Sequence, residues 1–173
     1  MKSIITFILL FVVLGVNAQT KIDSLVFNKI NIYRVSKGLS PYTFSVECSK
    51  SAELQTNFVF KNVKNGSKSV SHNGDSLTPT PRDRYLKVSG KNLKSINENI
   101  TYVGNFNYKK DDETALDELA NRILNNWIKS PTHNANLLSD NKYCGVSVLY
   151  TTSPSGFVNY EHYTTIATFV SVK

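Results

Sequence analysis

An amphipathic segment from Glu113 to Lys129 constrains the fold of this chain more than any other stretch. Its apolar residues recur at helical spacing and form one continuous stripe, so the segment predicts a helix that buries one face. The stripe consists of Leu116, Leu119, Ala120, Ile123, Leu124, Trp127 and Ile128. Ser130-Pro131 then ends this helix and favours a new one, with Ser as N-cap and Pro at the first helical position.

His133 therefore falls in the first turn of a short second helix. The positive end of a helix dipole disfavours an imidazolium at this place. A histidine that stays neutral can ligate a metal or accept a proton. The alternative is a surface histidine in a turn, and this segment by itself leaves both interpretations open.

The N-terminus has the pattern of an export signal. Lys2 supplies a positive charge, an apolar run from Ile4 to Leu14 follows, and Val16-Asn17-Ala18 has the small residues of a cleavage site. We expect residues 1–18 to be a signal peptide and residues 19–173 to form a single domain. The apolar run is too short for a comfortable membrane span, so we expect no transmembrane anchor. The mature protein is expected to be soluble and secreted, extracellular or periplasmic.

The charge of the chain is positive but dispersed. The formal net charge is +7, from 20 Lys and Arg against 13 Asp and Glu. No dense basic stripe with interleaved aromatic residues is present, which argues against nucleic-acid binding. Loose attraction to anionic membranes or cell-wall polymers is consistent with this charge.

The two cysteines, Cys48 and Cys144, lie far apart in the sequence and form no Cys-x-x-Cys pair. In an exported chain they favour one disulfide. The long loop that it would close corresponds to about 4.7 kcal/mol in the chain-entropy model. Two unpaired buried thiols are the alternative.

Helical patterns come first in the chain and strand patterns come last. Thr20 to Asp23 resembles a capping box, and a second helix is expected to start near Ser45. A short helical segment begins at Pro81. Strand patterns follow at 97–102, 143–150, 157–160 and 163–170, whereas 105–112 is expected to be a polar loop. This order favours an α+β layered domain over a parallel doubly wound sheet.

Three polar residues stand at junctions between predicted elements and loops: His72, Glu98 and His133. Functional side chains are commonly displayed at such junctions. They are too far apart in sequence to form a local motif, and spacing alone does not show that they meet. His162, in the last strand region, is expected to be a surface or edge residue.

Several segments together resemble the CAP superfamily of cysteine-rich secretory proteins, antigen 5 and group 1 pathogenesis-related proteins. The similarity is greatest to the compact bacterial branch and covers almost all of residues 19–173. The matching segments are 30–34, 37–41, 48–59, Ser71-His72, Glu98-Asn99-Ile100, Trp127 with Ser130-Pro131-Thr132-His133, and Gly145-Val146-Ser147-Val148. Their order and spacing, rather than any single motif, carry the resemblance.

The resemblance implies an α-β-α sandwich with a central antiparallel sheet between helical layers. It also implies that His72, Glu98 and His133 converge on one cleft. Many eukaryotic members hold two His and two Glu there, but the position of the second Glu is Ser130 in this chain. Cys48 and Cys144 do not match the usual disulfides of the large eukaryotic members, so their pairing rests on the export argument alone.

Three functions are compatible with these residues. The first is a binding module, expected to be a monomer, in which His72 and His133 bind Zn²⁺ or another divalent cation and Glu98 either ligates it or orients a histidine. The resemblance implies an extracellular ligand, which could be a lipid or sterol, a peptide or a cell-wall polymer. The second is a metal-dependent or His/Glu-assisted hydrolase with His72, Glu98 and His133 as catalytic candidates, and this is less favoured. The third is a structural or interaction protein without metal.

Overall fold

A computed structural model describes residues 20–64, 70–109, 112, 114–154 and 160–173. The predicted signal peptide, residues 1–18, lies outside the described residues. Among those residues, no helix has the length and apolar character needed to cross a membrane.

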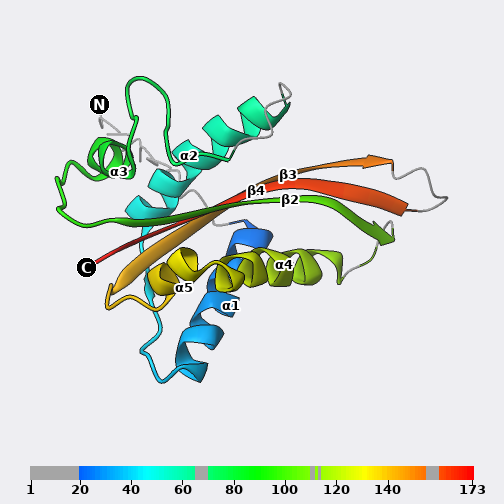
Figure 1. Cartoon of the computed structure of the whole chain (residues 1–173), viewed down its shortest axis with the longest axis horizontal. Coiled ribbons are helices and arrows are strands. Elements are labelled where there is room, and N and C mark those ends of the chain that lie inside the picture. Colours follow the sequence, from blue (N-terminus) through cyan, green and yellow to red (C-terminus); the bar gives the residue numbers. More distant parts are fainter. Residues whose placement is uncertain (1–19, 65–69, 110–111, 113, 155–159) are drawn as a thin grey trace, which may run out of the picture.

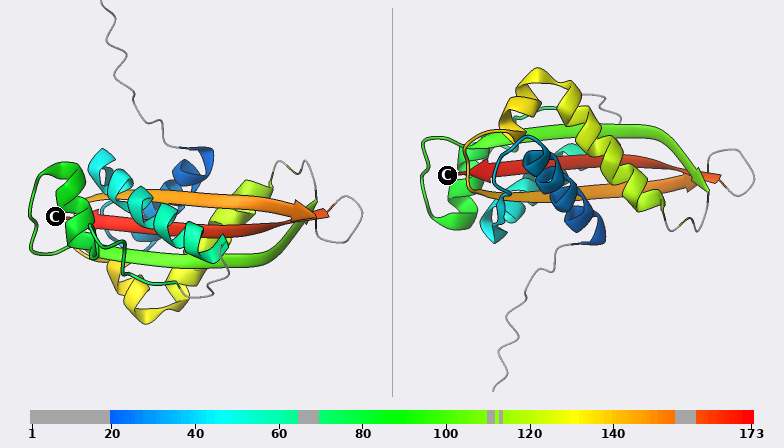
Figure 2. Two further views of the ribbon diagram at one scale, coloured as in Figure 1. Left: turned by 90° about the horizontal axis from the view of Figure 1, so that it is seen from above. Right: turned by 90° about the horizontal axis from the view of Figure 1, so that it is seen from below.

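The helices lie on both faces of one sheet (Figure 1). Their bounds are α1 (Lys21–Ser36), α2 (Val46–Lys64), α3 (Pro81–Ser89), α4 (Ala115–Lys129) and α5 (Pro131–Leu137). α1, α4 and α5 cover one face, and α2 and α3 lie on the other (Figures 1 and 2). This α-β-α arrangement is the layered α+β fold that the sequence predicts.

The sheet has the strand order β1-β3-β4-β2. The strands are β1 (Thr43–Phe44), β2 (Asn97–Lys109), β3 (Tyr143–Pro154) and β4 (Tyr160–Val172). β4 pairs antiparallel with both β2 and β3, whereas β1 pairs parallel with β3. The sheet is therefore mixed rather than wholly antiparallel, because the short β1 runs alongside β3 before α2 begins.

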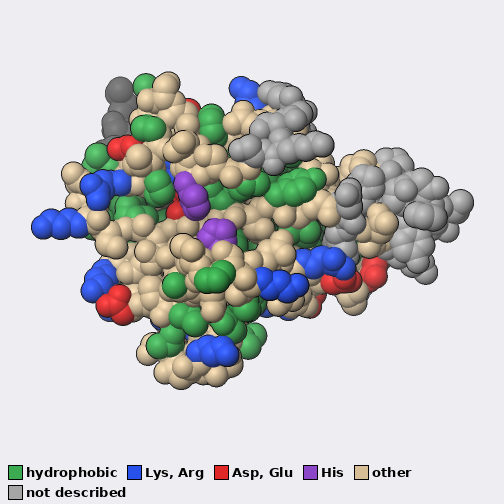
Figure 3. All heavy atoms as spheres, in the orientation of Figure 1, with side chains coloured by type: hydrophobic (Ala, Val, Ile, Leu, Met, Phe, Trp, Pro, Cys, Tyr) green, Lys and Arg blue, Asp and Glu red, His purple; other side chains and the backbone are tan. Residues whose placement is uncertain are grey.

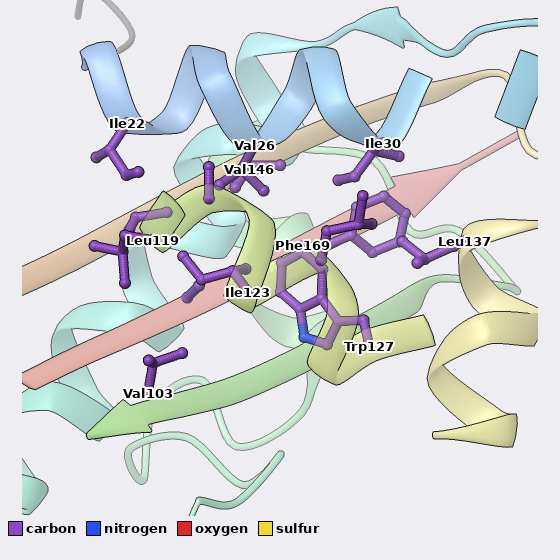
Figure 4. Close-up of a cluster of buried hydrophobic side chains, with 14 of the residues drawn as sticks. Ile22, Val26, Ile30, Val103, Leu119, Ile123, Trp127, Leu137, Val146 and Phe169 are labelled. Carbon is purple, nitrogen blue, oxygen red and sulfur yellow. The ribbon is translucent and has the colours of Figure 1, made fainter. Parts of the chain in front are cut away.

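The main core lies between the sheet and the layer of α1 and α4 (Figure 4). Ile22, Val26 and Ile30 of α1 face the stripe of α4 that the sequence predicts. Trp127 at the end of that stripe has no exposed surface, and its ring centroid is 6.1 Å from that of Phe169 in β4. This packing fixes the direction in which the chain leaves α4 toward α5.

Local sequence signals place the helix starts. Thr20 and Asp23 form a capping box at α1, in which each side chain bonds the backbone N–H of the other residue. Thr80 and Asp83 form the same motif at α3, with Pro81 as its first residue. Ser130 separates α4 from α5 as predicted, although its side chain makes no capping hydrogen bond.

The extent of β2 differs from the sequence prediction. Residues 105–112 were expected to form a polar loop, but β2 continues to Lys109. β4 pairs with this extension, with Asn107 opposite His162 and Lys109 opposite Tyr160, after a register shift between Val103 and Phe106. Pairing with a neighbouring strand thus makes a strand of a segment whose own composition favours a loop.

The predicted disulfide between Cys48 and Cys144 is wrong, because both cysteines are free. Cys144 packs in the core beneath α1 and α4, whereas Cys48 packs with Val170 and Val172 on the α2 face. Successive strand residues point to opposite faces. Gly145, rather than Cys144, therefore faces α2, and a Cβ there would collide with the backbone of Cys48 and Ser49.

Candidate functional site

His72 lies on the loop between α2 and α3 and is held from α2. The Gln55 amide donates hydrogen bonds to the carbonyls of Ser71 and Asn73, at 2.6 and 3.2 Å. These bonds fix the backbone on either side of His72. The Nδ1 atom of His72 lies 2.9 Å from Oε1 of Glu98 on β2. Two of the three predicted site residues are therefore in direct contact.

Glu98 is also bound by an arginine that the sequence analysis did not select. Arg84 of α3 lies with its Nη2 atom 2.9 Å from Oε1 and 2.7 Å from Oε2 of Glu98. The side chains of both residues are only 1% exposed. Nη2 also donates to the carbonyl of His72 at 3.1 Å. Arg84 thus joins α3, β2 and the His72 loop through one guanidinium.

His133 enters the site from the opposite layer, as the third residue of α5. The Asn99 amide donates to the His133 carbonyl at 2.9 Å, and the Asn136 amide donates to Asn99 Oδ1 at 2.8 Å. Asn134 accepts a hydrogen bond from the hydroxyl of Tyr33 in α1 at 2.9 Å. These side-chain amides tie α5 to β2 and α1, and so orient His133.

The two imidazole rings meet edge to face beside the edge strand β2. Their centroids are 6.2 Å apart and their planes meet at 65°. In the space-filling view, the histidine side chains lie side by side near the centre of this face (Figure 3). The His72 side chain is 53% exposed, whereas the Glu98 side chain beneath it is 1% exposed. Glu98 therefore forms the floor of the site, and the rings form its accessible surface.

The pKa of His133 lies below its usual value of 6.5, first because of burial and second because of the charge of His72. The sequence predicts a neutral His133 from the dipole of its helix, so the direction agrees and burial is the main cause. A neutral ring offers a lone pair to a cation or a proton.

Only some of the side chains at this site are suitable ligands for a divalent cation. Both oxygens of Glu98 contact Arg84, and a cation beside the guanidinium would be repelled by it. The described residues contain no group of three His, Cys, Asp and Glu side chains that could hold a metal. The rings of His72 and His133 remain as candidate ligands, and Glu98 contacts the His72 ring as carboxylates commonly do beside metal-bound histidines. Ser130, in place of a second Glu, adds no negative charge.

The structure thus brings together His72, Glu98 and His133, and leaves His162 apart from them. His162 of β4 pairs with Asn107 of β2, whereas Glu98 of β2 pairs with Val170 of β4. At about 3.3 Å per residue, these positions are roughly 26 Å apart. Arg84, Gln55 and Asn99 were missed, because nothing near them in the sequence indicates their partners. The one available signal was the run of three charged residues, Arg82-Asp83-Arg84, because a short helix on the surface cannot direct all three toward solvent.

Solved structures with a similar fold come from bacterial proteins. Among solved structures, an outer surface protein of Borrelia burgdorferi is similar at a TM-score of 0.55 and 17% identity, over 90% of this chain and 95% of that one. An extracellular SCP-domain protein of Bacillus anthracis matches at 0.54 and 19%, over 88% of this chain and 40% of the other. The CAP domain of enterococcal PrgA matches at 0.51 and 17%, over 92% and 63%.

This chain therefore spans less than half of the Bacillus protein and nearly all of the Borrelia protein. No curated protein matches the chain. A sequence model of the family described as "CAP: Cysteine-rich secretory protein family" matches residues 27–168. That range includes every residue of the His72–Glu98–His133 site and every element from α2 to β3, so the chain belongs to the CAP, or cysteine-rich secretory protein, family.

Proposed function

We propose that this protein is an exported binding module that binds a divalent cation, such as Zn²⁺, between His72 and His133. The observation that carries the proposal is the burial of Glu98 beneath the two rings, with Arg84 bound to both of its oxygens. Glu98 is then available to orient His72 and to keep its Nε2 atom directed at a ligand. A cation would supply an attachment point for an extracellular ligand.

The same observation disfavours the hydrolase. A general base must have a free oxygen within reach of the proton that it removes. Glu98 is buried and paired with Arg84, so it lacks that freedom. Cys48 and Cys144 are buried in the core, and burial raises the pKa of the Cys48 thiol to about 11. Neither thiol is a candidate nucleophile, because a reactive cysteine needs a low pKa and access to solvent.

Export is part of this proposal. It rests on the signal-peptide pattern of residues 1–18, and two structurally similar proteins are described as an outer surface protein and an extracellular protein. A lipid or sterol, a peptide or a cell-wall polymer would be the ligand. A cation site with two imidazole ligands would bind best at neutral pH, because protonation of an imidazole removes the lone pair that binds the cation.

Calorimetric titration of Zn²⁺ tests the cation site. We expect the wild-type protein to bind one ion with modest affinity and with release of protons at mildly acidic pH. His72→Ala and His133→Ala should each weaken binding by at least tenfold. His162→Ala is the matched control, since it removes an imidazole distant from the site and should leave the affinity unchanged.

Equal binding by all four proteins would refute the cation site. Undetectable binding by the wild type would favour the remaining alternative, in which the histidines and Glu98 form a hydrogen-bond network of an interaction protein. The hydrolase would instead be supported by metal-dependent turnover of a peptide or ester substrate that His133→Ala abolishes.

A further inference from the structure

The two edges of the sheet differ in whether other elements bind their outward backbone groups. Along the β3 edge, other elements bind the backbone groups that point away from the sheet. Ser45 N–H donates to the Cys144 carbonyl at 2.9 Å, and the Ser49 hydroxyl donates to the Val146 carbonyl at 3.2 Å. Val148 N–H donates to Asp23 Oδ1 at 2.7 Å. Such cover is how natural proteins protect an edge strand from unwanted pairing.

These bonds also show which backbone groups of β2 point outward. Antiparallel pairs alternate between residues that exchange hydrogen bonds and residues that do not. Since Val146 and Val148 direct their backbone groups away from β4, their β4 partners Phe169 and Ala167 must direct theirs toward β2. Those two residues lie opposite Asn99 and Thr101.

Asn99 and Thr101 therefore direct their N–H and C=O groups toward β4. The alternate residues of β2, Glu98, Ile100 and Tyr102, direct theirs away from the sheet. The Glu98 carbonyl agrees with this assignment, because it accepts a hydrogen bond from the Asn136 side chain of α5 at 3.3 Å. Ile100 is only 4% exposed, so other parts of the protein still cover the β2 edge at this residue.

The cover ends at Tyr102, which is 44% exposed. Its carbonyl receives a long 3.5 Å contact from the Thr101 hydroxyl. In the part of the chain that the structure describes, no strand lies beyond β2. From Ile100 to Tyr108 the strand also lacks charged residues and proline, two devices that commonly protect an edge.

A hollow of about 480 Å³ lies along this open stretch. It runs between the β2 edge and α4, and its lining includes Tyr102, Gly104, Asn121, Asn125, Asn126 and Lys129. A Cβ at Gly104 would collide with the Tyr102 ring, so glycine lets that ring lie along the strand. The hollow therefore combines open backbone groups with amide side chains, a lysine and the ion pair of Arg122 with Glu118.

We propose that the β2 edge at Tyr102–Gly104 binds an extended peptide of a partner protein, which adds a strand to the sheet. Backbone hydrogen bonds would supply affinity, and pockets for alternate side chains would supply specificity. Asn121 and Asn125 would bond polar groups of the peptide. Lys129, the last residue of α4, would favour an acidic side chain at that end. This site uses residues other than the cation ligands, so either proposal can fail without the other.

The shape of the edge favours a single strand over a second copy of the protein. α5 extends past β2 in both views of Figure 2, so the layer of α4 and α5 forms a ledge beside the edge. A single added strand needs only about 4.8 Å beyond β2 and can lie on this ledge. A second copy would have to bring its own α5 against the same ledge.

A panel of synthetic hexapeptides tests the proposal on the full domain. Each alternates threonine and valine and carries glutamate, glutamine or lysine at one end. Binding is followed by NMR shifts and by hydrogen exchange of the Tyr102 and Gly104 amides. We expect the glutamate peptides to bind most tightly and to slow exchange at both amides. Methylation of every peptide nitrogen, which blocks both edges of the added strand, should abolish binding.

Two variants separate backbone pairing from side-chain contact. Tyr102→Pro removes an outward N–H without breaking the pairing with β4, because proline is tolerated at the open edge of a sheet. Tyr102→Ala removes the same ring and keeps the N–H. We expect the proline variant to bind at least tenfold more weakly than the alanine variant. Unchanged thermal unfolding will show that both variants are folded.

Three results would overturn the proposal: no peptide of the panel binds at millimolar concentration, the N-methylated peptides bind equally well, or the two variants bind alike. Binding of a chitin oligosaccharide, lost equally in both variants, would assign the hollow to carbohydrate instead. A concentration-dependent dimer in sedimentation, broken by Tyr102→Pro, would assign the edge to a second copy.

Discussion

Arg84 is the residue on which the charge of the site depends. Its guanidinium neutralises Glu98 in a place where both side chains are 1% exposed. A buried carboxylate without a cation is costly, whereas a paired one is roughly neutral toward stability. Arg84 thus allows a negative side chain to lie beneath His72 without making the site strongly anionic.

Replacing Arg84 tests this role. Arg84→Met should lower the free energy of unfolding at neutral pH by about 3–5 kcal/mol, because it leaves Glu98 buried and unpaired. Arg84→Met combined with Glu98→Gln should recover part of the loss. Urea unfolding measures both, with Arg82→Met, a more exposed arginine of the same helix, as the control. Equal effects of Arg82→Met and Arg84→Met would contradict the buried ion pair.

His133 predicts a pH dependence of stability. Its pKa in the folded protein is lower than 6.5, so the unfolded chain binds more protons at mildly acidic pH. Stability contributed by this residue is then complete above about 6.5 and is lost as the pH falls below that value.

Proton NMR titration of the His133 ring measures this pKa directly. His72→Ala should move it upward by removing the second cause of the shift, whereas burial keeps it below 6.5. His133→Gln should flatten the pH dependence of urea stability between about 5 and 7. A His133 pKa above 6.5 in the wild type would be inconsistent with this account.

At the scale of elements, Asp23 links a helix start to a sheet edge. Its Oδ2 atom accepts from Thr20 N–H at 3.1 Å in the capping box, and its Oδ1 atom accepts from Val148 N–H of β3. Burial is the main cause that raises its pKa above 3.8, while these hydrogen bonds oppose the shift. One carboxylate therefore starts α1 and protects the β3 edge.

Asp23→Ala should cost about 2 kcal/mol, because it removes one of the two capping-box hydrogen bonds and leaves Val148 N–H without its acceptor. Asp23→Asn keeps one acceptor for Val148 and should cost less. Because the pKa is raised, the Asp23 contribution is complete below 3.8 and declines as the pH rises through the folded-state pKa. Hydrogen exchange at Val148 should accelerate in Asp23→Ala, and unchanged exchange there would argue against the edge role.

At the scale of the whole molecule, the sheet separates the two thiols. Cys144 belongs to the core under α1 and α4, and Cys48 belongs to the cluster with Val170. Burial raises the pKa of both thiols, to about 11 for Cys48 and well above its usual value for Cys144. The domain is thus stabilised by two packed layers and not by a cross-link.

This arrangement predicts the reactivity of the thiols. In the native protein neither cysteine should react with Ellman's reagent, because both are buried and protonated. In concentrated guanidinium chloride without reductant, both should react. A native protein whose mass is lower by two hydrogen atoms, with no thiol titrated after denaturation, would show that the cysteines do form the disulfide.

Much of the fold could be predicted from the sequence because its signals act over a few residues. The capping residues of α1 and α3, the stripe that ends at Trp127 and the helix start at Pro131 all correspond to observed elements. The sequence also predicts the candidate residues His72, Glu98 and His133, through their motifs and the family resemblance. Helix periodicity and capping depend on neighbours within one or two turns, so these elements leave a readable pattern.

Only the tertiary structure decided which residues meet across the sheet. Arg84 binds Glu98 because α3 packs beside β2, and β2 extends to Lys109 because β4 pairs with it. Cys144 faces away from α2 because the strand register places Gly145 there instead. A shift of one residue would exchange those faces, and register is set by contacts between distant segments. The sequence alone determined the layers and their helices, whereas long-range packing determined the partners of His72, Glu98 and His133, the separate thiols and the open edge of β2.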